Sequence, residues 1–139
     1  MLRRAVLGFL IAGITISVTA CGILGGGSDL TGKTWRWVAS TTAAPASQSV
    51  TPDPENYTIT FNSDDTYAGK ADCNQIAGDY TVSGDSLTIN AGPSTMAFCG
   101  EGSADQQFLA GLLSTTTYKI NAGALTLTNA AGDTMTFNS

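Results

Sequence analysis

The feature that most constrains the fold is a hairpin-like pattern that the chain contains twice, as YTVSGDSLTI (80–89) and YKINAGALTL (118–127). Each copy has a tyrosine, a β-branched aliphatic residue two positions later, a glycine-containing turn, and a Leu-Thr-aliphatic run. Alternation of apolar and polar residues is typical of strands with one buried face, and glycine between two such runs indicates a turn. The pattern predicts antiparallel hairpins.

Other segments alternate in the same way. Residues 34–40 place Trp35 and Trp37 on one strand face, residues 56–71 form a further hairpin pattern, and Met135 and Phe137 lie on a closing strand. About eight short strands with a single helix predict a mainly β fold. We expect a small antiparallel sheet curled into a partly open barrel, with the helix covering an open end or face.

One helix is predicted after residue 103. Ser103 is a candidate N-cap, and Gln106 would complete a capping box. The apolar residues that follow at helical spacing are Phe108, Leu109, Leu112 and Leu113. Glycine is unfavourable inside a helix, so Gly111 limits the expected length to about three turns.

Residues 41–55 contain three of the four prolines of the chain and show no periodicity. Such a segment is typical of a long surface loop, and we expect it to be mobile.

The amino-terminal segment has the organisation of a secretory signal peptide. A basic head, Met1 to Arg4, precedes an apolar run from Ala5 to Val18, and the small residues Thr19 and Ala20 follow. The apolar run is shorter than the roughly 20 residues that cross a bilayer as a helix. We therefore interpret residues 1–20 as a cleaved export signal.

The sequence Val18-Thr19-Ala20-Cys21 resembles the bacterial lipobox. This resemblance implies cleavage before Cys21 and lipidation of its thiol, which would anchor the chain on the extracytoplasmic face of the cell membrane. Residues 21–29 then form a glycine-rich, flexible tether, and residues 30–139 form one domain.

The charge of the expected mature chain excludes one class of partner. After removal of residues 1–20, four basic side chains remain against eleven acidic ones, a net charge of −7. Nucleic acids bind basic surfaces, so we expect no nucleic-acid partner. The expected partners are the membrane, through the lipid, and an envelope protein or ligand whose identity the sequence does not give. We expect a monomer.

The domain resembles the META domain, the HslJ-like group of small bacterial extracytoplasmic proteins, from Leu30 to the carboxyl terminus. The elements that carry this resemblance occur in the family's order: Leu30-Thr31-Gly32-Lys33-Thr34-Trp35, Ile59-Thr60-Phe61, Gly69 with Cys73-Asn74 and Gly78-Asp79-Tyr80, Thr95 with Cys99, Phe108-Leu109 with Leu112, and Leu125-Thr126-Leu127 with Phe137. The resemblance implies a β-rich domain with one helix, linked loosely to stress tolerance, envelope integrity and motility, and no established reaction.

Two departures from the family pattern occur. Asp72 stands where the family usually has glycine, directly before the signature cysteine. The family favours Thr-x-Met-Ala-Cys, whereas this chain reads Thr95-Met96-Ala97-Phe98-Cys99, so that Met and Ala come one position early.

Cys73 and Cys99 are interpreted as a disulfide. Export would place them where disulfides persist, and their spacing matches that of the family. A catalytic thiolate would need an electropositive environment, and the chain has no histidine. A zinc site would need more ligands than two cysteines supply. We expect no metal and no cofactor.

The remaining candidates for a functional site are weak. Trp35 and Trp37 could stack on a ligand or pack in the core, and core packing is favoured in so small a domain. Asn74 could contact a ligand or bond to nearby backbone. The carboxylate clusters Asp64-Asp65 and Asp53/Glu55 lie in turn or loop contexts and indicate solvated residues rather than an acid–base pair.

These observations predict a membrane-tethered extracytoplasmic domain that acts by non-covalent binding or as an envelope component, and not an enzyme. Two alternatives remain. One is an inhibitor of an exported protease or lysozyme, with residues 41–55 as the inserted element. The other is a hydrolase that uses carboxylates alone.

Overall fold

A computed structural model describes residues 29–139. The predicted signal peptide, the predicted lipidation site Cys21 and nearly all of the predicted tether lie outside these residues. The described chain forms nine strands, one short 3-10 helix and one α-helix: β1 (Thr34–Thr42), β2 (Ser47–Val50), η1 (Pro54–Asn56), β3 (Tyr57–Phe61), β4 (Thr66–Ala71), β5 (Asn74–Ser83), β6 (Ser86–Ser94), α1 (Asp105–Leu113), β7 (Thr115–Asn121), β8 (Ala124–Asn129) and β9 (Thr134–Asn138).

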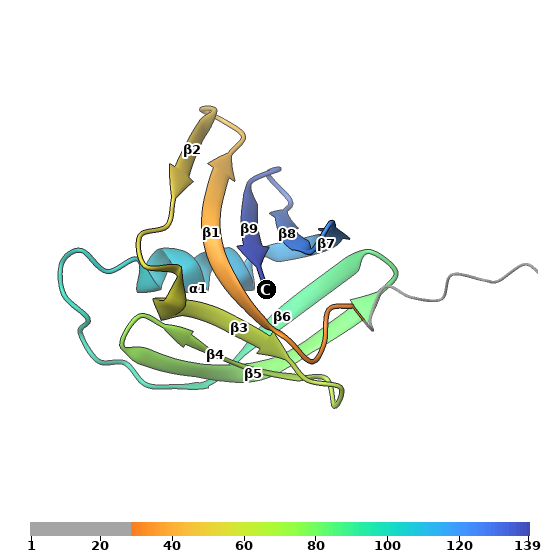
Figure 1. Ribbon diagram of the computed structural model, residues 1–139, viewed down its shortest axis with the longest axis horizontal. Helices are drawn as coiled ribbons and strands as arrows, with labels where there is room; N and C mark the ends of the chain where they lie inside the picture. Colours follow the sequence, from red (N-terminus) through yellow and green to blue (C-terminus); the bar gives the residue numbers. More distant parts are fainter. Residues whose placement is uncertain (1–28) are drawn as a thin grey trace, which may run out of the picture.

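The strands form one antiparallel sheet that closes on itself (Figure 1). Its order is β2-β1-β3-β4-β5-β6-β7-β8-β9, and β1 also pairs with β9, from Arg36↔Asn138 to Thr41↔Thr134. Of all neighbouring strands in the ring, β6 and β7 share the fewest paired residues, with the single pair Ser86↔Thr117. The prediction of a mainly β antiparallel fold with one helix is confirmed.

The repeated sequence pattern forms two hairpins of the same register. Tyr80 lies opposite Ile89 in β5 and β6, as Tyr118 lies opposite Leu127 in β7 and β8. The turns require the left-handed backbone conformation, at Gly84 (φ +61°) and at Gly123 (φ +80°). Glycine adopts this conformation without the steric cost of a Cβ atom, so the turn glycines fix where each hairpin reverses.

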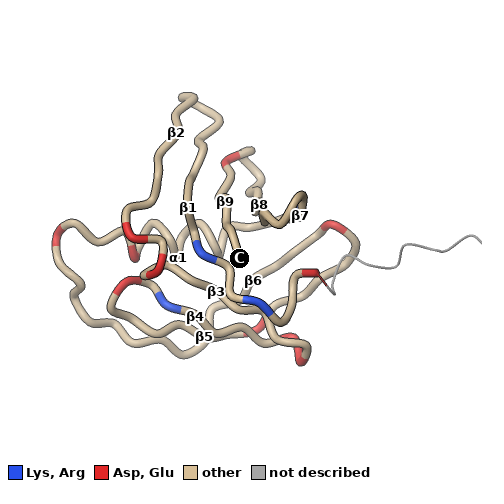
Figure 2. The backbone as a smooth tube through the Cα atoms, in the orientation of Figure 1, with Lys and Arg blue, Asp and Glu red and all other residues tan. Residues whose placement is uncertain are grey.

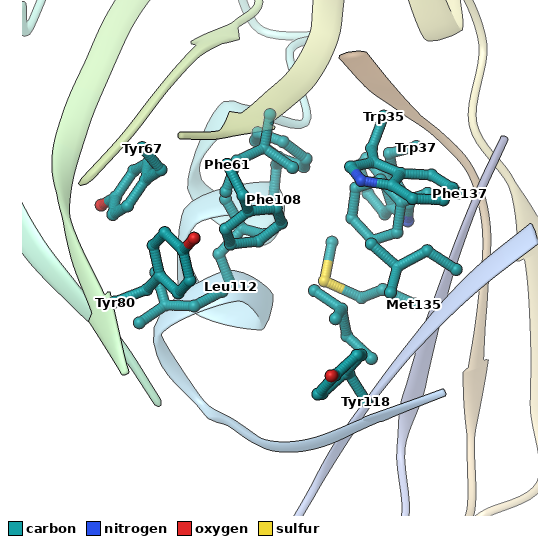
Figure 3. Packing of buried hydrophobic residues seen from close by; sticks show 14 of the residues in the cluster. Trp35, Trp37, Phe61, Tyr67, Tyr80, Phe108, Leu112, Tyr118, Met135 and Phe137 are labelled. Atoms are coloured by element: carbon teal, nitrogen blue, oxygen red, sulfur yellow. The ribbon is translucent and has the colours of Figure 1, made fainter. Parts of the chain in front are cut away.

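Aromatic side chains fill the interior of the ring (Figure 3). Phe108 of α1 packs against Trp37 of β1, with ring centroids 5.5 Å apart, and against Tyr57 of β3, 5.7 Å away. Its ring also lies 6.3 Å from that of Phe137 in β9. The helix therefore ties together strands from both ends of the chain, as expected for an element that covers the core.

The helix differs from its prediction in two respects. Its N-cap is Ala104, without a side-chain hydrogen bond, so the predicted capping box of Ser103 and Gln106 is wrong. The Ser103 hydroxyl instead accepts a hydrogen bond from the Asp105 N–H, at 3.2 Å. On the predicted apolar face, Phe108 and Leu112 are buried and Leu109 is partly buried, whereas Leu113 is 44% exposed.

The predicted loop at residues 41–55 is largely ordered into secondary structure. β1 continues to Thr42, β2 returns antiparallel to it with Thr42 opposite Ser47, and η1 follows. The backbone pairing with β1 explains why a segment without apolar periodicity forms a strand, because all four side chains of β2 are exposed and none contributes to the core. This hairpin projects from the ring (Figure 1).

Within residues 29–139, no helix is long and apolar enough to span a lipid bilayer.

Candidate functional site

The predicted disulfide between Cys73 and Cys99 is present, with Cα atoms 5.5 Å apart. Cys73 lies in the tight turn between β4 and β5, and Cys99 lies in the segment that leads from β6 to α1. We call residues 95–104 the crossing segment. Because it contains no helix or strand of its own, its position depends on bonds to the neighbouring sheet.

Asn74 provides the main non-covalent attachment of the crossing segment. Its buried side-chain amide accepts hydrogen bonds from the Ala97 N–H (2.8 Å) and the Thr95 hydroxyl (3.0 Å). The same amide donates to the Ala97 carbonyl (3.0 Å) and to Cys99 Sγ (3.3 Å). Its two acceptor positions and two donor hydrogens are all used. Asn74 therefore has a structural role. Its partners are residues distant in sequence, whereas the structural role considered from the sequence was hydrogen bonding to the nearby backbone.

Two further contacts fix the ends of the crossing segment. At its start, Thr95 pairs with the Gln75 backbone, since the Thr95 N–H donates to the Gln75 carbonyl and its hydroxyl accepts from the Gln75 N–H. At its end, the Tyr57 hydroxyl accepts from the Ala104 N–H at 2.9 Å and donates to the Asp72 carboxylate at 3.4 Å. The segment is thus held at both ends and in the middle.

The crossing segment presents two large apolar side chains to solvent. Met96 is 90% exposed and Phe98 is 83% exposed, and they flank Ala97, whose backbone Asn74 holds. The other large apolar residues exposed in the described chain are Val50 on β2 and Leu113 on α1. The other aromatic side chains of the described chain are buried in the core, so Phe98 is the exception among them.

Trp35 and Trp37, the other candidates for a binding surface, are buried. Their exposed fractions are 0% and 2%, and their indole N–H groups donate to the Leu30 and Ala39 carbonyls. They are therefore not accessible for stacking on a ligand, and the alternative of core packing describes them.

The carboxylates of the described chain are the candidates for an acid–base pair. None of the Asp and Glu residues in the described chain is buried. Hydrogen bonds from the Thr66 hydroxyl and N–H lower the pKa of Asp64, and a bond from the Ala43 N–H, aided by Asn129, lowers the pKa of Asp133. A general acid at neutral pH needs a raised pKa, whereas both shifts favour the ionised form. No group of three or more Cys, Asp or Glu residues within 29–139 is placed to hold a metal ion.

A shallow cavity of about 350 Å³ lies between α1, the second half of β1 and the β8–β9 hairpin. Its lining includes Gly111 and Met135 at the helix contact, and hydroxyl or amide side chains such as those of Ser40 and Gln107. The lining carboxylate, that of Asp133, already accepts bonds from the Ala43 N–H and from Asn129. The cavity is at the small end of ligand pockets and has room for a small polar molecule. Sequence patterns gave no signal for it, because its lining comes from five separate elements, β1, α1, β7, β8 and β9.

A family model described as the META domain matches residues 28–139. The chain belongs to the META domain family. A search of curated proteins finds no match to this META domain.

Solved structures show the same fold at low sequence identity. A protein of the DUF4847 family from Bacteroides vulgatus has 16% identity and a TM-score of 0.63, over 78% of this chain and 93% of that one. A protein from Burkholderia xenovorans, solved by NMR, has 22% identity and a TM-score of 0.60, over 78% of this chain and 82% of that one. At these identities the similarity establishes the fold alone.

The geometry gives physical reasons for the META signature residues. A Cβ atom on Gly69 would lie 2.2 Å from the Thr58 carbonyl oxygen, and one on Gly78 would lie 2.2 Å from that of Asn90. Both strands thus approach their neighbours too closely for a side chain. Asp72 has a left-handed backbone (φ +57°), which accounts for the glycine usual at this META position.

Proposed function

We propose that this protein is a lipid-anchored, extracytoplasmic META-domain protein that acts by non-covalent binding or as a component of the cell envelope, and that it carries out no reaction. The apolar signal-like run and Cys21 support the anchor. The net charge of −7 supports a domain that stays in water beside the membrane rather than adsorbing to its anionic lipids.

One observation carries the binding role: the fastened crossing segment presents Met96 and Phe98 to solvent. A disulfide, four hydrogen bonds of one buried amide and a Tyr57 bond all act on a segment without secondary structure. Preorganised apolar side chains are suited to recognition, because little conformational freedom is left to lose on binding. In the described chain no carboxylate is buried, which supports a role without acid–base catalysis.

Metabolic labelling tests the anchor. In a bacterial host that receives the full chain, radiolabelled palmitate should be incorporated into the protein, and the C21A substitution should abolish the label. The native protein should stay with the membrane pellet in high salt. An unlabelled native protein would remove the anchor from the proposal. Turnover that survives purification of the full chain would remove the non-enzymatic role.

The projecting β1–β2 hairpin favours a second candidate function, inhibition of an exported protease or lysozyme. All four residues of β2 are exposed, and the hairpin extends beyond the closed ring (Figure 1). Thr41 lies opposite Gln48, so replacing residues 42–47 with Asn-Gly should shorten the hairpin without changing its register. If the full chain inhibits lysozyme or a serine protease, the shortened variant should lose that inhibition. Absence of inhibition by both proteins would remove this candidate.

A hydrolase that uses carboxylates alone has no such support. It would need two acidic side chains facing one pocket, and the cavity beside α1 contains Asp133 as its lining carboxylate.

A further inference from the structure

Met96 and Phe98, which we call the apolar tip, lie among negative charges. Asp72 precedes the disulfide turn, Glu101 follows Phe98 in the crossing segment, and Asp105 begins α1. The Tyr57 hydroxyl links this group together, because it contacts both the Asp72 carboxylate and the Ala104 backbone. Asp72 adjoins Cys73, whose disulfide partner Cys99 directly follows Phe98, and Glu101 comes two residues after Cys99, so carboxylates lie near the apolar tip both across the disulfide and along the segment.

The acidic border extends to the neighbouring connection. Asp53 directly precedes η1 and Glu55 lies within it, and the Asn56 carbonyl accepts a hydrogen bond from the Asp72 N–H at 2.7 Å. Two cations lie nearby: Arg36 pairs with Glu55 at 2.9 Å, and Lys70 donates to the Asn56 side chain at 2.8 Å. The two positive charges stand against the five carboxylates of Asp53, Glu55, Asp72, Glu101 and Asp105, so the net charge of this region is 2 − 5 = −3. Figure 2 shows the acidic positions gathered where the β2–β3 and β4–β5 connections meet the segment before α1.

The negative charge around the apolar tip favours some binding partners over others. A second copy would bring a like-charged border against the first, and such juxtaposition is repulsive. An anionic membrane surface would be repelled for the same reason. The described chain also begins at the opposite side of the molecule from the segment between β6 and α1 (Figure 1). A complementary occupant combines an apolar recess with lysine or arginine around it.

We infer that the apolar tip is a docking site for an exported protein whose surface has an apolar recess bordered by basic side chains. This inference rests on the proposed binding role and specifies its partner. Phe98 is the anchor, since aromatic residues and methionine are enriched at interfaces and one buried aromatic carries a large share of the binding free energy. The carboxylates steer the partner and set its orientation. Phe98 stands where the family pattern has alanine, which makes the anchor a feature of this chain.

Site-specific photocrosslinking in intact cells tests the docking site. A photoreactive phenylalanine analogue is placed at position 98 of the full chain and, as a matched control, at position 50, because Val50 is similarly exposed (78%) on a different element. Position 98 should crosslink to an exported protein at a site rich in Lys and Arg, and position 50 should not. The yield should fall about tenfold with M96S and with the charge reversal E101K/D105K. In isolated envelopes it should also fall in 0.5 M salt, on the order of tenfold, because salt screens the steering charges.

The other outcomes overturn the inference. Crosslinking to lipid would assign the tip to the membrane, crosslinking to a second copy would make it a self-association surface, and no crosslink would leave it without a partner. A protein crosslinked equally from positions 50 and 98, or insensitive to E101K/D105K, would also contradict it. Thermal melts of M96S and F98S should match the native protein, because both side chains are exposed. If palmitate labels Cys21 while position 98 yields nothing, the docking site fails and the anchor stands.

Discussion

The side chain of Asn74 holds the backbone of Ala97 on both sides, accepting its N–H at 2.8 Å and donating to its carbonyl at 3.0 Å. One amide thus acts toward Ala97 as a neighbouring strand would, in a segment that belongs to no strand. The arrangement fixes the two exposed residues on either side and links the sheet to the connection that carries them.

The N74A substitution should therefore lower the free energy of unfolding by about 2–3 kcal/mol, because it removes four hydrogen bonds that each contribute about 0.5–1.5 kcal/mol. N90A serves as the control, since Asn90 is exposed and bonds to the exposed Asp79. Urea denaturation of both variants measures the difference. Equal, small effects of N74A and N90A would show that the amide does not hold the segment.

Loss of the disulfide should also destabilise the fold. A cross-link over 26 residues contributes about 3.5 kcal/mol on the loop-entropy estimate, so the C73S/C99S double variant should lose roughly that amount. Combining it with N74A should cost less than the sum of the two losses, because both act on residues 97–99. Additive losses in denaturant melts would argue that the two attachments are independent.

Gly69 should not tolerate alanine. A Cβ atom there would lie 2.2 Å from the Thr58 carbonyl oxygen, which belongs to the paired strand and cannot move alone. We expect G69A to destabilise by about 2–3 kcal/mol through overpacking. G102A is the matched control, because nothing lies within 4 Å of its Cβ position. Comparable melting temperatures for the two variants would contradict the close approach.

Position 72 gives a test of backbone conformation. Asp72 has φ +57°, which glycine adopts freely and alanine does not. D72G and D72A both lose the contact with the Tyr57 hydroxyl, so the backbone effect is the difference between them: we expect D72A to be less stable than D72G by about 1 kcal/mol in urea denaturation. If alanine proved as stable as glycine, the left-handed conformation would not be what selects the residue.

The acid sensitivity of the fold should depend on Asp64. Hydrogen bonds from Thr66 lower its pKa below the usual 3.8, so the folded state binds its proton less readily than the unfolded chain. The associated stability is present above pH 3.8 and is lost as the pH falls through the folded-state pKa. D64N and T66V should each flatten the decline of stability in this range. Acid titrations that superimpose on the native curve would refute the role of this contact.

The sequence predicts those parts of the fold that follow from the local spacing of apolar and polar residues. The two hairpins of 80–89 and 118–127 can be derived from apolar spacing and turn glycines, and the buried side of α1 from Phe108 and Leu112. β2 could not be predicted, because its exposed side chains carry no pattern and backbone pairing with β1 alone makes it a strand. The helix begins one residue later than predicted, since Ala104 is its N-cap, and the Ser103 hydroxyl bonds to the Asp105 N–H rather than to the Gln106 N–H that a capping box requires.

The site was predicted less well than the fold. The pairing of Cys73 with Cys99 followed from the expected export and the family spacing, and the structure contains it. The partners of Asn74 lie 21 to 25 residues away, a distance at which no local rule operates. The exposure of Met96 and Phe98 could not be derived either, since apolar residues are expected inside until the fold shows otherwise. One signal was available: Met96 and Phe98 lie in a segment that belongs to none of the predicted strands or hairpins, so no strand face was predicted to bury them.

The pairing of β1 with β9 determines when the ring of strands can close during folding. A ribosome delivers the chain from its amino end, so one edge of β1 stays open until residues 134–138 have been made. Partial chains therefore offer an unsatisfied strand edge to proteases, chaperones and one another. The ring therefore closes only when residues 134–138 become available to pair with β1.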